Sequence, residues 1–423
     1  QGLIQALCAR GRAGELKNIK LQHLHTEGAA PYAEQEFEGV FQLESYFVGH
    51  NVRKATQDGW ADYIPVHLSE TQKLIRMGIT PVDVAMIQVC PPDKHGYVSM
   101  GTSVDATLAA VQTAKTVIAV INPNVPRAWG DAIIKLSDID IFCEDNTPLI
   151  EAKPAQPSEQ DIQIGKNCAG LIEDGACLQM GIGAIPNAVL SQLGNHKNLR
   201  IHTEMFADGV LPLVESGVIN GRNKAIDKGV LPLYYKGVIN NLNKKYDKGK
   251  IVSTFLMGSK AVYDFIDDNP AVAMMDVGYT NDPYIIAQQP KMTAINSALS
   301  IDLTGQVNAD SLGCKFYSGC GGQLDFIRGA AASEGGKPII AMPAITAKGI
   351  SKISPTLLNG AGVVTTRFDV HYVVTEYGVA DLYGKTLQDR AKALIRIAAP
   401  QCQEELDKAA FERFGSHFHF ITK

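Results

Sequence analysis

The stretch CLQMGIGAIPNAVL, residues 177–190, combines a short apolar run, a Gly-x-Gly turn and the start of a helix. Pro186 is acceptable there because the first helical turn leaves its N–H groups unpaired in any case. Such a turn can hold an anion, since free amides point outward and no Cβ blocks close approach. Pro186 and Asn187 interrupt the dinucleotide fingerprint Gly-x-Gly-x-x-Gly, and the chain has no Gly-Lys-Ser/Thr phosphate loop. The segment therefore predicts an α/β unit without identifying its ligand.

Similar units recur along the whole chain. Apolar, β-rich runs alternate with longer helical patterns, which is typical of layered α/β structure with mainly parallel strands. The runs cover residues 18–23, 82–89, 116–121, 177–180, 199–202, 251–256 and 339–342. Near the other end, Thr386 with Asp389 three residues later predicts a capped helix whose apolar positions continue to Ala398.

The Pro-rich, polar segment at residues 151–161 lacks an apolar period and is interpreted as a linker. It divides the chain into residues 1–150 and 162–423. The first residues, from Gln1 to Leu7, have the pattern of the middle of a helix. We therefore expect the N-terminal domain to be incomplete, with any targeting segment lying upstream.

An internal repeat with a period of 20 follows in the second part. Two copies do not make a solenoid, so we interpret the repeat as a local duplication on the surface, where added loop length costs little. A lid near the functional site is the alternative. The paired segments are 209–213 with 229–233, 217–220 with 237–240, and 227–229 with 247–249.

Composition and charge exclude several function classes. The 423 residues include 39 Lys plus Arg and 44 Asp plus Glu, a net charge of −5, which argues against nucleic-acid binding driven by bulk charge. No apolar run approaches the ~20 residues that span a membrane. The cysteines show no zinc spacing, so we expect no metal site and reduced core thiols of an intracellular protein. They are Cys8, Cys90, Cys143, Cys168, Cys177, Cys314, Cys320 and Cys402.

Two carboxylates follow apolar strands directly. Glu204 ends the run LRIHTEMFADG (199–209), and Glu376 ends the run VVTEYG (373–378). Ligands of open parallel sheets bind at the carboxyl ends of the strands, so Glu204 is placed as a functional group would be. The alternatives are that Glu204 caps the next helix or pairs with His202. Glu376 is a second candidate acid, with capping or pairing inside the C-terminal domain as the simpler interpretation.

The segment FYSGCGGQLDF (316–326) has three glycines in four positions. Bare backbone N–H groups of this kind can form an oxyanion hole, whereas close packing of the backbone is the structural alternative. Cys320 lies between two of these glycines. With no neighbouring base visible in the sequence, we interpret it as a small filler and not as a nucleophile.

These segments together resemble the acetyl-CoA hydrolase/transferase family of CoA-transferases, including the 4-hydroxybutyrate, butyryl-CoA:acetate and acetate:succinate types. The resemblance covers nearly the whole chain and implies two similar open, mainly parallel α/β domains. The carrying segments are LHTEGAAPY (24–32), PPDKHGYVSMGTSVD (91–105), NPNVPRAWGDA (122–132), MGIGAIPNAVLSQL (180–193), HTEMFADG (202–209), FLMGSKAVYDFIDDNP (255–270), YTNDPYIIAQ (279–288), GQVNADSLG (305–313), SGCGGQLDFIRGA (318–330) and VVTEYGVADLYGKTLQDRAKALIRIA (373–398).

The resemblance also implies a mechanism and a set of site residues. Glu204 would be the nucleophile, passing through an acyl–glutamyl anhydride to a glutamyl–CoA thioester. Gly321 and Gly322 would donate backbone hydrogen bonds to the oxyanions. The CoA-contacting positions would be Gly181, Ile182, Gly183 and Asn281.

The expected activity is CoA transfer between a short-chain acyl-CoA and a free carboxylate, with no permanently bound cofactor. Acyl-CoA hydrolysis at the same glutamate is the first alternative. A catalytically inactive CoA- or phosphate-binding protein on the same scaffold is the second. Relatives imply a homo-oligomer, located in mitochondria in a eukaryote and otherwise in the cytoplasm. Nucleic acid and membranes are not expected partners.

Overall fold

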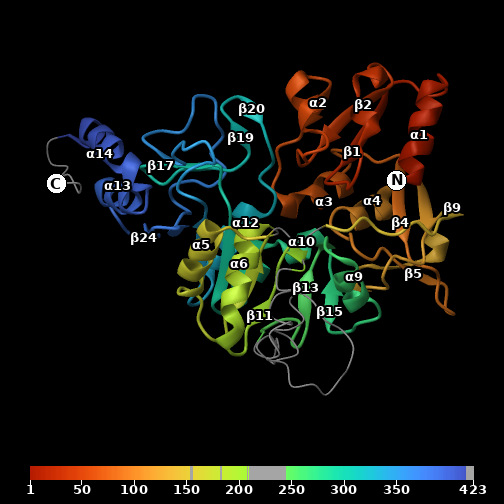
Figure 1. Ribbon diagram of the computed structural model, residues 1–423. Helices are drawn as coiled ribbons and strands as arrows, with labels where there is room; N and C mark the ends of the chain where they lie inside the picture. Colours follow the sequence, from red (N-terminus) through yellow and green to blue (C-terminus); the bar gives the residue numbers. More distant parts are fainter. Residues whose placement is uncertain (153–155, 182, 207, 209–243, 416–423) are drawn as a thin grey trace.

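The fold is an assembly of α/β layers in two halves (Figure 1). We describe a computed structural model of the chain, which covers all residues except 153–155, 182, 207, 209–243 and 416–423. The 20-residue duplication lies almost wholly outside the described residues, as do Ile182 and the C-terminal tail. In the described part of the chain, no helix is both long and apolar enough to cross a membrane.

Six parallel strands of the N-terminal half form two separate three-stranded sheets, with the orders β1-β2-β3 and β4-β6-β9. The sequence predicts parallel strands but not this division. Strands β5 and β8 form a separate antiparallel pair. The elements are α1 Gly2–Arg12, β1 Ile19–His23, β2 Phe41–Ser45, α2 Arg53–Asp58, β3 Ala61–Tyr63, α3 Leu68–Arg76, β4 Val84–Val89, β5 Tyr97–Ser99, α4 Thr107–Thr113, β6 Thr116–Ile121, β8 Ile133–Lys135 and β9 Ile141–Glu144.

A six-stranded sheet of order β11-β10-β16-β21-β23-β24 organises the C-terminal half. All its pairings are parallel except β23 with β24. Because the carboxyl ends of parallel strands lie at one edge, the turn after β10 and the loop after β11 open on the same side. The bounds are α5 Glu159–Ala169, β10 Cys177–Met180, α6 Ala184–Gln192, β11 Arg200–Ile201, β16 Met292–Asn296, α12 Gln323–Ala332, β21 Lys337–Ala341, β23 Tyr372–Thr375 and β24 Gly378–Asp381.

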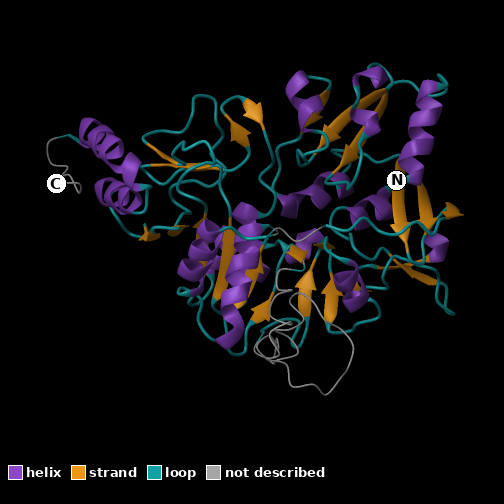
Figure 2. Cartoon of the chain, in the orientation of Figure 1, coloured by secondary structure: helices purple, strands orange, loops and turns teal. Residues whose placement is uncertain are grey.

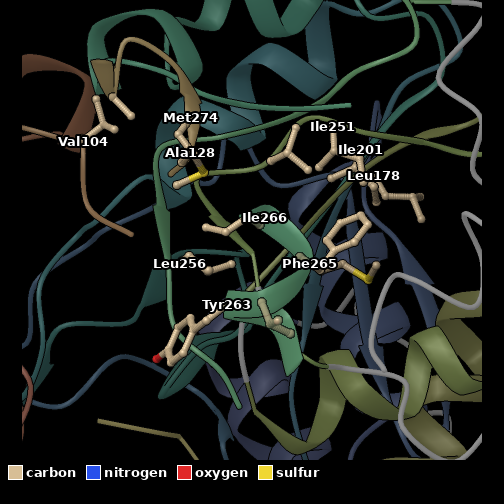
Figure 3. Packing of buried hydrophobic residues seen from close by; sticks show 14 of the residues in the cluster. Val104, Ala128, Leu178, Ile201, Ile251, Leu256, Tyr263, Phe265, Ile266 and Met274 are labelled. Atoms are coloured by element: carbon tan, nitrogen blue, oxygen red, sulfur yellow. The ribbon is translucent and has the colours of Figure 1, made fainter. Parts of the chain in front are cut away.

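Small sheets and a shared core join the two halves. Strand β7 of the N-terminal half pairs with β15 of the C-terminal half. Figure 3 shows part of the buried apolar cluster, in which Val104 and Ala128 lie in one core with Leu178 and Ile201. The halves are therefore fixed against each other by a continuous core. The joining elements are β7 Trp129–Gly130, β12 Met205–Phe206, β13 Ile251–Ser253, β14 Phe255–Leu256, α9 Lys260–Ile266 and β15 Val272–Met274.

The remaining elements are short strands and helices of the C-terminal half (Figure 2). The capped helix predicted after Thr386 is confirmed, because the Thr386 side chain accepts a hydrogen bond from the Asp389 backbone N–H. The elements are α10 Val277–Thr280, α11 Pro283–Ala287, β17 Ser300–Asp302, β18 Val307–Asn308, β19 Ser311–Leu312, β20 Lys315–Phe316, β22 Ile353–Ser354, α13 Leu387–Arg396 and α14 Pro400–Phe414.

The cysteines and the predicted linker differ in part from the expectations. All eight cysteines are free, as expected, but Cys143 and Cys314 are exposed and so are not core thiols. Cys143 lies in β9, whose four residues are all exposed. Helix α5 begins at Glu159, so residues 159–161 of the predicted linker are helical, with Ser158 as the cap.

Candidate active site

Glu204 lies in the loop after β11, and its backbone is held firmly. Its carbonyl oxygen accepts hydrogen bonds from the backbone N–H groups of Thr254 and Phe255, each at 3.1 Å. The Ser253 hydroxyl donates a third bond at 3.0 Å. These contacts come from the segment of β13 and β14, so the strands fix the direction in which the side chain leaves the backbone.

The half-buried Glu204 carboxylate is enclosed by an amide and a glycine backbone. The Nδ2 atom of Asn281 donates to Glu204 Oε2 at 2.9 Å, and the Asn281 side chain is fully buried. The backbone of Gly322 also lies close to the carboxylate. A Cβ on Gly322 would stand 1.9 Å from Glu204 Oε2 and 2.2 Å from Asn281 Nδ2, so any other residue at this position would have to displace one of these side chains.

The surroundings of the Glu204 carboxylate bring its ionisation close to neutral pH. Burial raises the pKa of Glu204 to about 7, and the nearby Asp325 adds to the rise. The hydrogen bond from Asn281 and the backbone of Gly322 oppose it, because they stabilise the charged form. A perturbed carboxylate among convergent donors is a common property of catalytic groups.

The N-terminal half reaches this site through the first turn of α3. The Leu68 N–H donates to the Gly321 carbonyl at 3.0 Å. The Ser69 N–H and hydroxyl both donate to the Asp325 carboxylate, at 3.1 Å and 2.9 Å. Gly321 itself has φ +54, a left-handed conformation that favours glycine. The glycine-rich segment therefore lies where the two halves meet.

Cys320 does have a neighbouring base, contrary to the sequence-based expectation. The Nδ1 atom of His67 lies 3.4 Å from its sulfur. The sequence could not show this, because 253 positions separate the two residues. Burial raises the pKa of the Cys320 thiol to about 12, so it stays protonated at neutral pH and is a poor nucleophile.

The Gly-x-Gly turn after β10 stands next to the Glu204 loop. The Thr203 hydroxyl donates to the Met180 carbonyl at 3.2 Å, which joins the ends of the two strands. Gly183 has φ +120 and precedes α6. Cβ atoms built on Gly181 and Gly183 would have no neighbour within 4 Å among the described residues. Open space at this turn is consistent with approach by a ligand.

The structure gives both His202 and Glu376 a structural environment away from the Glu204 carboxylate. His202 is fully buried with Nε2 2.8 Å from the Thr280 carbonyl, and burial lowers its pKa to about 3. It is a buried core histidine whose Nδ1 has no hydrogen-bond partner among the described residues, and the side chain that binds the Glu204 carboxylate is that of Asn281. Glu376 accepts hydrogen bonds from the Ala344 N–H at 2.9 Å and from the Gln160 side chain at 2.5 Å, which confirms its structural interpretation.

Comparison with family models decides the assignment. The model described as the acetyl-CoA hydrolase/transferase N-terminal domain matches residues 1–151, and the corresponding C-terminal domain model matches residues 258–410. This chain belongs to the acetyl-CoA hydrolase/transferase family. The α/β architecture expected from the resemblance is therefore confirmed for this family member.

Curated relatives and solved structures agree with this assignment. The chain is 50% identical to the succinyl-CoA:acetate/propanoyl-CoA:succinate CoA transferase of Fasciola hepatica, over 97% of this chain and 82% of the relative. It is 47% identical to the 4-hydroxybutyrate coenzyme A transferase of Clostridium kluyveri, over 94% and 88%. The crystal structure of RipA from Yersinia pestis superposes with a TM-score of 0.88 at 34% identity, covering 97% of this chain and 91% of that one.

Sequence reasoning missed the contribution of the N-terminal half to this family member's site. His67 and Ser69 carry no motif of their own, and only docking of α3 brings them to the glycine-rich segment. Asp325 was visible in the sequence as part of SGCGGQLDFIRGA, but with no assigned role. Its position as the third residue of α12, directly after the glycines, is the signal that could have identified it.

Proposed function

We propose that this protein transfers coenzyme A between a short-chain acyl-CoA and a free carboxylate, with Glu204 as the carrier. The observation that supports this role is the Glu204 carboxylate itself, which is bound by Asn281, lies close to the Gly322 backbone and has its pKa raised to about 7 by burial. A carboxylate is suited to the task because its anhydride and thioester lie close in energy to the substrate thioester. One difficult exchange thereby becomes several balanced steps.

The proposed reaction begins when a Glu204 oxygen attacks the acyl carbonyl. The carbon–sulfur bond breaks, CoA leaves as a thiolate, and an acyl–glutamyl anhydride remains. The thiolate then attacks the glutamyl carbonyl, which releases the first acid as its carboxylate and leaves a glutamyl–CoA thioester. The acceptor carboxylate attacks this thioester, displaces the thiolate and forms a second anhydride. Attack of the thiolate on the acceptor's acyl carbon gives the new acyl-CoA and restores Glu204.

Each addition step places negative charge on a former carbonyl oxygen, and the site offers donors for it. Asn281 Nδ2 already points at Glu204 Oε2, so it can stabilise the oxyanion formed on the glutamyl carbon. The backbone N–H of Gly322 approaches the same carboxylate, and Gly321 supplies the adjacent amide. In this proposal the turn of Gly181, Ile182 and Gly183 contacts CoA at the neighbouring strand end.

The substrate range is proposed from the relatives, which are named for acids such as acetate, succinate, propanoate and 4-hydroxybutyrate. We expect acids of this size here, used without a permanently bound cofactor because the CoA thioester is itself the substrate. A homo-oligomer and an intracellular location, mitochondrial in a eukaryote, complete the proposal. Size-exclusion chromatography with light scattering and cell fractionation would test these two points.

A panel assay tests the proposed function. Purified protein is incubated with acetyl-CoA and, in separate reactions, acetate-sized and succinate-sized acids, and the new CoA thioesters are quantified by chromatography. We expect at least one acid to be converted, with little thioester loss when no acid is added. Thioester loss that is independent of any acid would instead identify a hydrolase.

Two variants locate that activity. Glu204→Gln keeps the shape of the side chain but removes the nucleophile, so exchange should fall by at least ~10³-fold. Glu376→Gln is the matched control, because it alters the other strand-end carboxylate while keeping an oxygen for the Ala344 N–H. Equal activity of Glu204→Gln and the control would contradict the assignment.

A further inference from the structure

Phe47 lies in the loop after β2, at the carboxyl end of a parallel strand of the N-terminal half. Its neighbours Tyr46 and Val48 are buried, with 4% and 0% of their surface exposed, whereas Phe47 is only half-buried. The Gly49 N–H donates to the Phe47 carbonyl at 3.1 Å and closes a three-residue turn. The loop therefore fixes Phe47 with part of its surface outside the core of its own half.

The Phe47 ring packs against the glycine-rich segment of the other half. A Cβ on Gly319 would stand 3.0 Å from Phe47 Cδ2 and 3.4 Å from Phe47 Cα. The Tyr63 hydroxyl, at the end of β3, would stand 3.3 Å from the same Cβ. A larger residue at position 319 would therefore have to push the Phe47 ring away. Close packing with Phe47 is a reason for glycine at this position.

Phe47 and Glu204 border the same space beside Gly321. A Cβ on Gly321 would stand 3.6 Å from Phe47 Cε2 and 3.9 Å from Glu204 Oε1, which are ordinary van der Waals distances. Apart from the chain neighbours of Gly321, no other heavy atom of the described residues stands within 4 Å of that point. The oxygen on this side is Oε1, whereas Asn281 binds Oε2.

The two oxygens of Glu204 have different tasks in the proposed reaction. When the thiolate attacks the glutamyl carbonyl, one oxygen becomes the oxyanion and the other leaves with the first acid. Asn281 Nδ2 is placed to stabilise an oxyanion at Oε2. Oε1 is then the oxygen that attacks the acyl carbon and stays bonded to it in the anhydride. The acyl chain is thereby brought next to the Phe47 ring.

We infer that the Phe47 ring forms one wall of the acyl subsite and restricts this subsite to short acyl chains. The inference rests on the proposed function, and it assigns a residue to the acyl specificity of the same site. A phenyl ring offers an alkyl chain contact area but no hydrogen bond, so its effect depends on the size of the chain. Apolar pockets typically discriminate between acids that differ by one methylene by ~10–200-fold.

Donor and acceptor occupy this subsite in turn, because each acid forms its anhydride with the same glutamate. A wall beside Oε1 must therefore select both of them. A residue that contacts only the CoA part of the donor has no such effect, since the CoA part is the same in every acyl-CoA. Parallel selection of donor and acceptor is thus the property that distinguishes a wall of the acyl subsite.

The experiment compares kcat/KM of the wild type, Phe47→Ala and Phe47→Leu. Acetate, propanoate and hexanoate are the acceptors with acetyl-CoA as donor, and acetyl-CoA and hexanoyl-CoA are the donors with propanoate as acceptor. We expect the hexanoate-to-propanoate ratio of kcat/KM to rise at least ~10-fold in Phe47→Ala and by a smaller factor in Phe47→Leu. The matched control is Phe368→Ala, which removes a phenyl ring that is 84% exposed and should keep the wild-type ratio.

The ratio is a readout that a merely structural residue would not move. Loss of packing alone would lower kcat/KM for all acids by one common factor, and an unchanged ratio in Phe47→Ala would overturn the inference. The hexanoyl-CoA-to-acetyl-CoA ratio should rise in parallel, and a shift confined to the acceptors would overturn the inference too. If Phe47→Ala does not fold, the ratios of Phe47→Leu decide in the same way.

Glu204→Gln, measured in the same assays, keeps this inference apart from the proposed function. If Glu204→Gln abolishes exchange while the ratios of the Phe47 variants stay unchanged, only the role of Phe47 fails. If Glu204→Gln exchanges CoA as fast as the wild type, the proposed function fails, and the acyl subsite beside Oε1 fails with it.

Discussion

Asn281 binds, and Gly322 lies beside, the same oxygen of Glu204. The Asn281 Nδ2 atom lies 2.9 Å from Oε2, and a Cβ on Gly322 would lie 1.9 Å from it. This oxygen therefore already has an amide donor, with the Gly322 backbone close beside it, before any substrate arrives. Donors placed in advance need no reorganisation when charge develops, which is how preorganised sites accelerate acyl transfer.

Gly322→Ala should reduce kcat by ~10²–10³-fold, because the added methyl group must displace the Glu204 carboxylate or the Asn281 amide. Steady-state exchange assays give the value, and circular dichroism checks the fold. Gly170→Ala is the matched control, since Gly170 has φ −63 and its Cβ would meet only ordinary contacts of 3.5 Å or more. Full activity of Gly322→Ala would show that the carboxylate is not confined as described.

The profile of log kcat/KM against pH should fall on the acid side with an apparent pKa of about 7. In the proposed mechanism Glu204 attacks only in its ionised form, and burial raises its pKa to about 7, so activity is expected to be lost as the pH drops through that value. The measurement is initial-rate exchange from pH 5 to about pH 9 at constant ionic strength. A plateau that extends down to pH 5 would disagree with a buried, reactive glutamate.

Asn281→Ala should lower kcat by about 10²-fold and move the acid limb to higher pH. The lost hydrogen bond stabilises the charged carboxylate, so its removal raises the pKa of Glu204 further. Asn269→Ala serves as the control, because it removes a similar amide bond, to the Phe265 carbonyl, in the loop after α9. A limb that stays in place would separate Asn281 from the ionisation of Glu204.

Replacing Glu204 should raise the stability of the folded protein, although it lowers the activity. The folded-state pKa of Glu204 lies above its unfolded value, so the stability that its neutral form contributes at low pH is lost as the pH rises through about 7. Glu204→Gln removes the buried charge. Its melting temperature should therefore exceed that of the wild type by about 1–3 °C at pH 8 and by less at pH 5, in thermal unfolding scans. A difference in melting temperature that grows as the pH is lowered would contradict this prediction.

Local sequence patterns predicted the elements that depend on local chemistry. The runs at 116–121 and 177–180 became β6 and β10 with the same bounds, because runs that are apolar except for Thr116 and Gln179 suit strands with little exposed surface. The helix at Thr386 followed from its capping residues. The division of the N-terminal strands into two sheets depends on long-range pairing, which no local pattern encodes.

The candidate site was predicted in part. The strand-end position of Glu204 and the glycines of residues 319–322 could be found from the sequence, and the structure brings Glu204, Asn281 and Gly322 into contact. Ser69 and His67 could not be found, because they join the site only when α3 docks on residues about 250 positions away. The prediction that Cys320 has no neighbouring base was wrong for the same reason.

Trapping the covalent intermediate tests the central claim most directly. The protein is incubated with acetyl-CoA, treated with sodium borohydride, digested and sequenced by mass spectrometry, beside a sample without acetyl-CoA. The account predicts that Glu204 alone is converted to the alcohol, and only in the sample that received acetyl-CoA. An unmodified Glu204 in protein that is actively exchanging CoA, or an alcohol at a different carboxylate, would contradict it.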